Sequence, residues 1–92
     1  MELETFARNI LDDTVTSLKA EYAGIPQSVK DVMPKAALLI AKGAIDGDLG
    51  PNDSAQLKHA SAIMANVTVG GQIALNKLML DLRKQWVMHI FL

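Results

Sequence analysis

No charged residue occurs in the stretch His59-Ala-Ser-Ala-Ile-Met-Ala-Asn-Val-Thr-Val-Gly-Gly-Gln-Ile-Ala-Leu-Asn76, which lies between Lys58 and Lys77. From Ser54 onward, apolar residues recur at spacings of three and four, the period of one helix face. They are Leu57, Ala60, Met64, Val67, Gly71, Leu75, Leu78, Leu82 and Trp86. The pattern predicts a long C-terminal helix around which the rest of the chain is organised.

Two adjacent glycines, Gly70 and Gly71, interrupt this pattern after the β-branched run Val67-Thr68-Val69. A glycine inside a helix costs about 1 kcal/mol relative to alanine, and β-branched residues are also weak helix formers. We still expect one continuous helix over 54–90, because the glycines have no polar loop and no Ser, Asp or Asn to cap a new start. The alternative is a hairpin with helices at 54–69 and 72–90.

The N-terminal part predicts an amphipathic helix over 2–22. Its apolar residues lie on one stripe at helical spacing, and charged residues occupy the other face. Gly24 is a candidate C-terminal cap, and Pro26 follows just beyond it. We therefore expect this helix to end before Ile25.

A second helical region follows at once. Ser28 and Asp31 have the spacing of a capping box, which predicts one helical turn over 28–33. A helix with Pro34 in its first turn should then run to about Ile45, since proline is tolerated there. The segment 36–41 is apolar on nearly every side, so it predicts the most buried helix.

The segment 45–53 predicts the main loop, because Gly47, Gly50 and Pro51 all break regular structure. We expect Asn52 or Asp53 to cap the helix that follows. The loop carries four oxygen-bearing side chains, but glycine and proline stand at EF-hand ligand and turn positions and no glutamate closes the set. The sequence therefore predicts no metal site here.

The turn Asp46-Gly47-Asp48-Leu49-Gly50-Pro51 resembles the D-G-x-[F/L]-G-P turn of peptidoglycan-binding helical domains. In that family a helix with a threonine cap and apolar positions follows the turn. Asp53 stands at the threonine position, Leu57 fits an apolar one, and Ala60 replaces the family's aromatic residue. The resemblance spans about twelve residues and implies cell-wall binding as a minor alternative function.

Length and composition predict a single small domain over 1–92 that is all-α. Half of the residues are hydrophobic, four are aromatic and none is cysteine. Many small side chains favour helices packed at close range, and a chain of this size buries a limited share of its surface. We expect an antiparallel helical bundle of three (or four) helices with a long C-terminal helix, stabilised by association into a homo-oligomer.

The residues give little support for catalysis, cofactor binding or nucleic-acid binding. Two histidines thirty residues apart and the absence of cysteine leave no nucleophile–base pair. The net charge of −1 and four scattered cations in the C-terminal half provide no basic stripe. We expect a non-enzymatic protein without cofactor or metal.

The predicted function is structural: assembly through helix–helix contacts with further copies or with another helical protein, as in an accessory subunit of a virus particle or secretion apparatus. Small residues allow close approach of helices, and the apolar C-terminal end predicts a contact surface. The candidate interface residues are Ala65, Gly70, Gly71, Ala74, Leu75, Leu78, Leu82, Trp86, Ile90 and Phe91.

The main alternative is membrane association, either through residues 59–76 or through the apolar C-terminus. The uncharged stretch would span about 27 Å as a helix, close to the thickness of a bilayer's hydrocarbon core. The acidic, amphipathic N-terminus lacks the pattern of a secretion signal. We therefore expect a cytoplasmic protein or a component of a soluble assembly.

Overall fold

Six helices and no strand occur in the part of the chain that the structure, a computed structural model, describes. That part is residues 2–47 and 49–91, without the side chains at 45, 46 and 89–91. The helices are α1 (Leu3–Leu18), α2 (Ala20–Ala23), α3 (Gln27–Lys30), α4 (Met33–Asp46), α5 (Pro51–Val67) and α6 (Val69–Phe91). The all-α helical bundle and its long C-terminal helix are thus confirmed.

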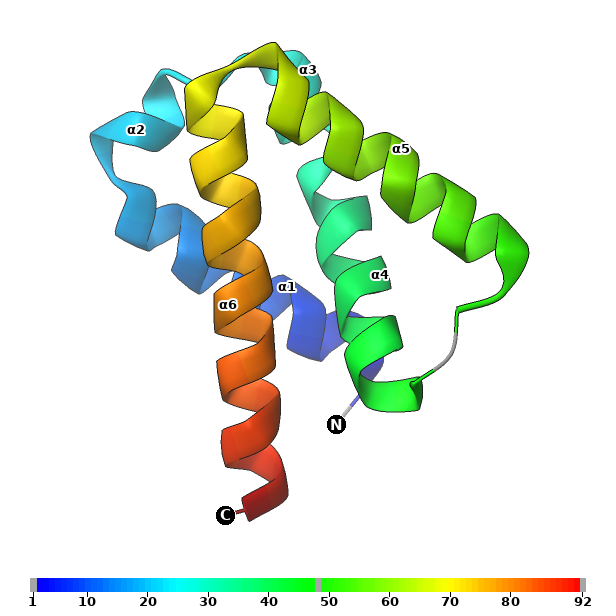
Figure 1. The fold of residues 1–92 in the computed structure, drawn as a ribbon. Coiled ribbons are helices and arrows are strands. Elements are labelled where there is room, and N and C mark those ends of the chain that lie inside the picture. Colours follow the sequence, from blue (N-terminus) through cyan, green and yellow to red (C-terminus); the bar gives the residue numbers. More distant parts are fainter. Residues whose placement is uncertain (1, 48, 92) are drawn as a thin grey trace.

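The helix α6 contacts every other long helix of the bundle. It packs on α1, α4 and α5, and α1 also packs on α4. Figure 1 shows α1 crossing behind α4 and α6, while α4, α5 and α6 reverse direction in turn. The last turns of α6 extend beyond the ends of the other helices (Figure 1). Because α4 likewise packs on α1, α5 and α6, these two helices together join the bundle.

The expected continuous helix over 54–90 is wrong, because the chain turns at Thr68. Thr68 adopts an extended conformation and separates α5 from α6. Its hydroxyl oxygen accepts a hydrogen bond from the backbone N–H of Gly71 at 3.0 Å, which is the geometry of a helix N-cap. The cap that the sequence argument missed is this threonine, two residues before the first glycine. Both glycines lie inside α6.

Gly71 allows α5 and α6 to approach closely at this corner. A β-carbon placed on Gly71 would collide with the carbonyl oxygen of Met64 and lie 3.1 Å from the Met64 carbonyl carbon. Both atoms belong to the backbone of α5. The small residue is needed here because the first turn of α6 packs on the last turn of α5.

The expected helix over 2–22 is interrupted at Lys19. α1 ends at Leu18, and Lys19 has a positive φ of 54° before the single turn of α2 begins. The bend redirects the chain so that Ile25 is buried and Tyr22 packs partly against the core. Gly24 is the C-terminal cap of α2, in a right-handed conformation. The helix therefore ends earlier than its apolar spacing predicts.

The second region matches the prediction in outline and differs in its caps. A single turn, α3, precedes α4, whose first turn contains proline. Pro26 occupies the N-cap of α3 without a side-chain cap, and Asp31 accepts a hydrogen bond from the Gln27 amide at 2.8 Å. The capping box of Ser28 and Asp31 is therefore wrong.

The loop is shorter than 45–53. α4 ends with Gly47 in the left-handed conformation (φ 73°), and α5 begins at Pro51 after an N-cap at Gly50 that has no side-chain bond. Asn52 and Asp53 lie in the first turn of α5 and do not cap it. Asp53 instead pairs with Lys42 of α4 at 2.6 Å, which ties the two helices together across the loop.

Buried apolar residues from five helices, α1, α3, α4, α5 and α6, form one core. α4 provides its centre, as predicted, because three of its alanines and Met33 are almost fully buried. α6 adds Leu78 and Leu82, and α5 adds Met64. The core of small side chains lets α4 pack between its neighbours at close range.

Candidate interaction surface

The helix α6 has two apolar faces on opposite sides. Its inner face is buried against the bundle and consists of Gly71, Ala74, Leu75, Leu78 and Leu82. At 100° per residue these positions lie within one half of the helix circumference. This inner face is the stripe that the sequence pattern identifies.

Four exposed apolar residues form what we call the outer stripe. They are Val69, Ile73, Leu80 and Val87, with exposed fractions of 78%, 41%, 64% and 46%. The last three are spaced seven residues apart, so they align along the helix on the side opposite Leu78. A helix that is apolar on both sides normally has partners on both sides.

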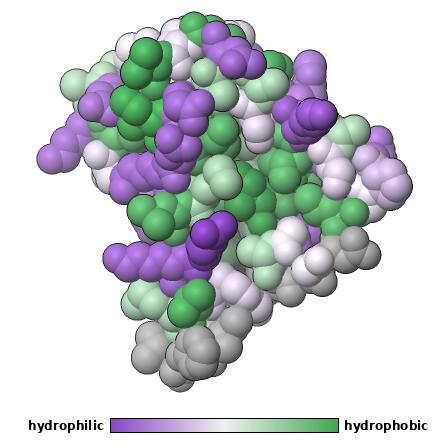
Figure 2. Space-filling view, in the orientation of Figure 1, coloured by the Kyte–Doolittle hydropathy of each residue, from purple (hydrophilic) through white to green (hydrophobic). Residues whose placement is uncertain are grey.

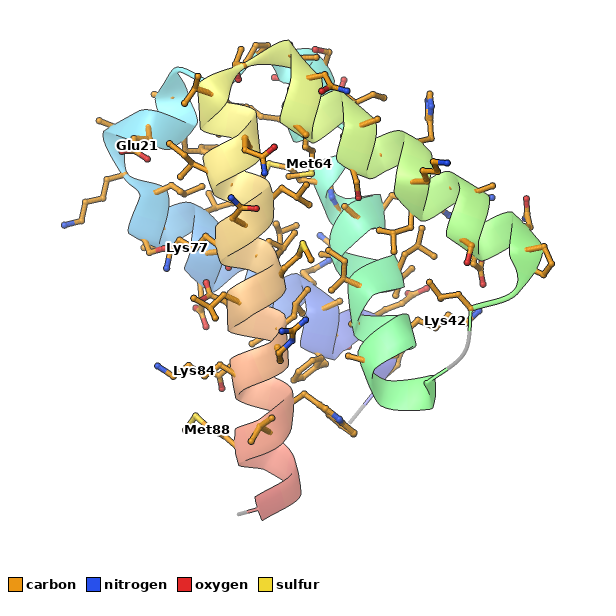
Figure 3. All side chains as sticks on the ribbon, viewed as in Figure 1. Glu21, Lys42, Met64, Lys77, Lys84 and Met88 are labelled. Carbon is orange, nitrogen blue, oxygen red and sulfur yellow. The ribbon has the colours of Figure 1, made fainter. Side chains whose placement is uncertain are left out.

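Cations flank the outer stripe. Lys77 and Lys84 lie on one side of it and Arg83 on the other, by helical position. Figure 3 shows Lys77, Lys84 and Met88 pointing from the same edge of α6, away from α4 and α5. In Figure 2, hydrophobic and hydrophilic residues alternate down the α6 side of the molecule. The exposed face of α6 is therefore apolar and positively charged.

The acid of this helix, Asp81, faces α1 instead. Its Oδ2 lies 2.7 Å from the hydroxyl of Thr14 and 3.6 Å from the Lys77 ammonium. Thr14 is fully buried, and its hydroxyl also lies 2.9 Å from the Ile10 carbonyl oxygen. Since a hydroxyl has one proton to donate, the charged carboxylate is its stronger partner. This link fixes which side of α6 faces the bundle.

An aromatic contact holds α6 farther along. The rings of Phe6 and Trp86 meet edge to face, with centroids 6.4 Å apart and an interplanar angle of 77°. Such a pair contributes about 0.5–1.5 kcal/mol beyond burial. Together with the Thr14–Asp81 bond it sets the rotation of α6, and so the direction in which the outer stripe points.

The structure distributes the predicted interface residues between several environments. Half of them are buried against other helices of the same chain: Gly71, Ala74, Leu75, Leu78 and Leu82. Ala65, Gly70 and Trp86 are half-buried. The side chains of Ile90 and Phe91 lie outside the described residues. A contact with another molecule stays a prediction for these positions.

Sequence reasoning missed the outer stripe, although a signal for it was present. The spacing of Ile73, Leu80 and Val87 is readable from the printed sequence. The same helix carries a second apolar series on its inner face. Because apolar residues then occur on two sides of the helix, the sequence pattern does not single out either series. Only the fold decides which series is covered.

A groove opens on another part of the surface, between the first halves of α1 and α4. Its volume is about 600 Å³. Its apolar lining is Ala7, Leu11, Ala37 and Leu38, and its charged lining is Glu2, Glu4, Arg8, Asp31 and Lys35. None of these five charged residues forms an ion pair with another described residue. We call this feature the α1/α4 groove.

Neither a cluster of metal ligands nor a membrane-spanning helix occurs in the described residues. No three His, Cys, Asp or Glu side chains are close enough there to hold a metal ion. The uncharged stretch 59–76 is divided between α5 and α6, and none of the helices described combines the length and apolarity needed to cross a bilayer. His59 is exposed on α5. The side chains of Asp46, Asp48 and His89 lie outside the description.

Comparisons with known proteins give no relative for this chain. No protein-family model, no curated protein and no solved structure matches it. The function must therefore be argued from the surface of the molecule itself.

Proposed function

We propose that this chain is a non-enzymatic structural protein that assembles with further copies of itself, or with another helical protein, through helix–helix contacts. The observation that carries the proposal is the outer stripe of α6. Four large apolar side chains line up on the solvent side of a helix whose other side already packs in the core. Exposed apolar side chains that recur every seven residues along one side of a helix are typical of helix–helix seams.

Size supports the same proposal. A 92-residue chain buries only about 60–65% of its unfolded surface, which leaves a monomer marginally stable. No disulfide adds to the core, because the chain contains no cysteine. Covering the outer stripe would bury more apolar surface, and each square ångström of it contributes about 25 cal/mol.

The test is the mass of the native protein, compared with that of a variant whose stripe is charged. Light scattering after size exclusion should give a mass above one chain for the wild type. Leu80→Glu should shift the protein toward the monomer, since it places a carboxylate in the middle of the stripe. Leu80 is largely exposed, so this variant should keep the helical circular dichroism of the wild type.

Ala62→Glu is the matched control, because it introduces the same charge at an exposed position of α5. It should leave the native mass unchanged. A wild type that remains a monomer up to millimolar concentration would contradict the proposal.

A second candidate function is binding to an anionic membrane surface through the same stripe. Lys77, Arg83 and Lys84 flank apolar residues as in helices that lie at the lipid interface. Co-sedimentation with vesicles separates the two functions. An assembly protein should stay in the supernatant with both neutral and anionic phospholipid vesicles, whereas a membrane-binding protein should pellet with the anionic ones.

A further inference from the structure

The outer stripe and the α1/α4 groove are two uncovered surfaces on one chain, the first convex and the second concave. We infer that the outer stripe of one copy binds in the α1/α4 groove of a second copy, so that the chain assembles head to tail. This inference rests on the proposed assembly function and names its geometry: which surface of one copy meets which surface of the next.

The two surfaces of a single chain cannot meet each other. The inner face of α6 packs on α1 and α4, and the outer stripe lies on the opposite side of the helix. The stripe therefore points away from the two helices that form the groove. A contact between stripe and groove has to join two copies, and each copy retains one free stripe and one free groove.

The apolar parts of the two surfaces match in kind. Ala7, Leu11 and Ala37 are largely buried and form the apolar floor of the groove, and the half-buried Leu38 adds an apolar wall. A helix that presents a ridge of Ile73, Leu80 and Val87 is the type of ligand that such grooves bind, through anchors about one or two turns apart.

The charges also match. Three carboxylates and two cations line the groove, so its rim carries a net charge of −1. Of the three cations that flank the stripe, Lys77 is paired with Asp81, whereas Arg83 and Lys84 form no ion pair with another described residue. Pairing stripe with stripe would bring the Arg83 and Lys84 cations of both copies together, which opposite-charge pairing avoids. Charge complementarity thus favours the groove over a second stripe.

A contact between two different surfaces has a consequence that a symmetric dimer lacks. Because each copy offers both surfaces, head-to-tail contacts continue from copy to copy and end in a ring or an open filament. Two variants, each defective in one surface, should then complement one another and stop at a pair.

The experiment uses Leu80→Glu as the stripe variant and the double variant Glu4→Lys/Asp31→Lys as the groove variant. The reversal changes the groove rim from −1 to +3, since two carboxylates become two ammonium groups. Each variant alone should self-associate about tenfold or more weakly than the wild type. An equimolar mixture should form a 1:1 complex by sedimentation velocity and native mass spectrometry.

The matched control is Asp12→Lys/Asp13→Lys, which makes the same charge change at exposed positions of α1 outside the groove. It should associate like the wild type. Circular dichroism of all variants checks that each is folded. If the stripe variant unfolds, Arg83→Glu/Lys84→Glu replaces it, because both residues are exposed.

Other outcomes identify which idea fails. If the groove variant associates like the wild type while the stripe variant does not, the head-to-tail inference is overturned and the assembly function stands. If the wild type does not self-associate but binds anionic vesicles, and only the stripe variant loses this binding, the head-to-tail contact and the assembly function are both overturned in favour of membrane binding. A wild type that stays monomeric at every concentration tested would also contradict both the head-to-tail contact and the assembly function.

Discussion

Gly71 lies where α5 and α6 cross, and a methyl group there would meet backbone instead of a flexible side chain. Its added β-carbon would collide with the Met64 carbonyl, whereas the same addition at Gly70 meets only Ile25 Cγ1 at 3.4 Å and Thr68 Oγ1 at 3.8 Å. Two neighbouring glycines of one helix therefore have different roles. The close approach of α5 and α6 depends on Gly71, whereas a β-carbon can be accommodated at Gly70.

Alanine substitutions at these two positions should have different effects on stability. Gly71→Ala should lower the free energy of unfolding by about 1–3 kcal/mol, the usual cost of overpacking. Gly70→Ala should leave it unchanged or raise it by up to about 1 kcal/mol, because alanine is the better helix former. Urea titrations followed by circular dichroism measure both, and equal losses in the two variants would contradict the crossing geometry.

At the scale of the helices, periodicity identified the buried face of α6 and the helical regions that contain α1 and α4, but it joined α5 and α6 into one helix. It failed at the places where a helix ends. Thr68 and Lys19 interrupt helices whose apolar spacing continues across the break. Because the spacing is the same on both sides of a short break, periodicity alone does not reveal where the helix ends. Caps depend on single hydrogen bonds, such as that from Gly71 to Thr68, and these follow from tertiary packing.

The candidate site was less predictable than the fold. The sequence placed most of the predicted interface on the segment that forms α6, but it included residues such as Leu78 and Leu82, which are almost fully buried in the chain's own core. Which of two apolar faces stays uncovered depends on how α1 orients α6. The contacts that accompany this orientation join residues far apart in the chain, such as Thr14 and Asp81, which lie 67 positions apart.

The α1–α6 link can be measured with a double-mutant cycle on Thr14 and Asp81. Thr14→Val should destabilise the fold by about 1.5–3 kcal/mol, because it removes a buried donor to a charged group. Asp81→Asn should cost less once the threonine is gone, so the cycle should show a coupling energy of about 1 kcal/mol or more. Chemical denaturation of the four proteins provides the values.

Thr16→Val is the control for this cycle. Thr16 is exposed, and its hydroxyl donates only to the Asp12 carbonyl oxygen of the same helix. Its replacement should change stability by less than about 0.5 kcal/mol. Strict additivity of Thr14→Val and Asp81→Asn would show that the bond does not orient α6.

Over the whole molecule, charge is divided between the two parts of the chain. Residues 1–53 contain nine acids and five bases, and residues 54–92 contain one acid and four bases. The groove belongs to the acidic part and the outer stripe to the basic part. A chain of this kind attracts a second copy when the copies meet by unlike ends, although its net charge is only −1.

Salt should therefore weaken self-association of the wild type. Screening shortens the range of charge interactions from about 10 Å at 0.1 M to about 3 Å at 1 M ionic strength, so the attraction between groove rim and stripe cations decreases as sodium chloride is added. Dissociation constants from sedimentation velocity at several salt concentrations should rise across this range. If the stripe of one copy instead packed on the stripe of another, the same salt would screen the repulsion between the Arg83 and Lys84 cations of the two copies, and association would become tighter.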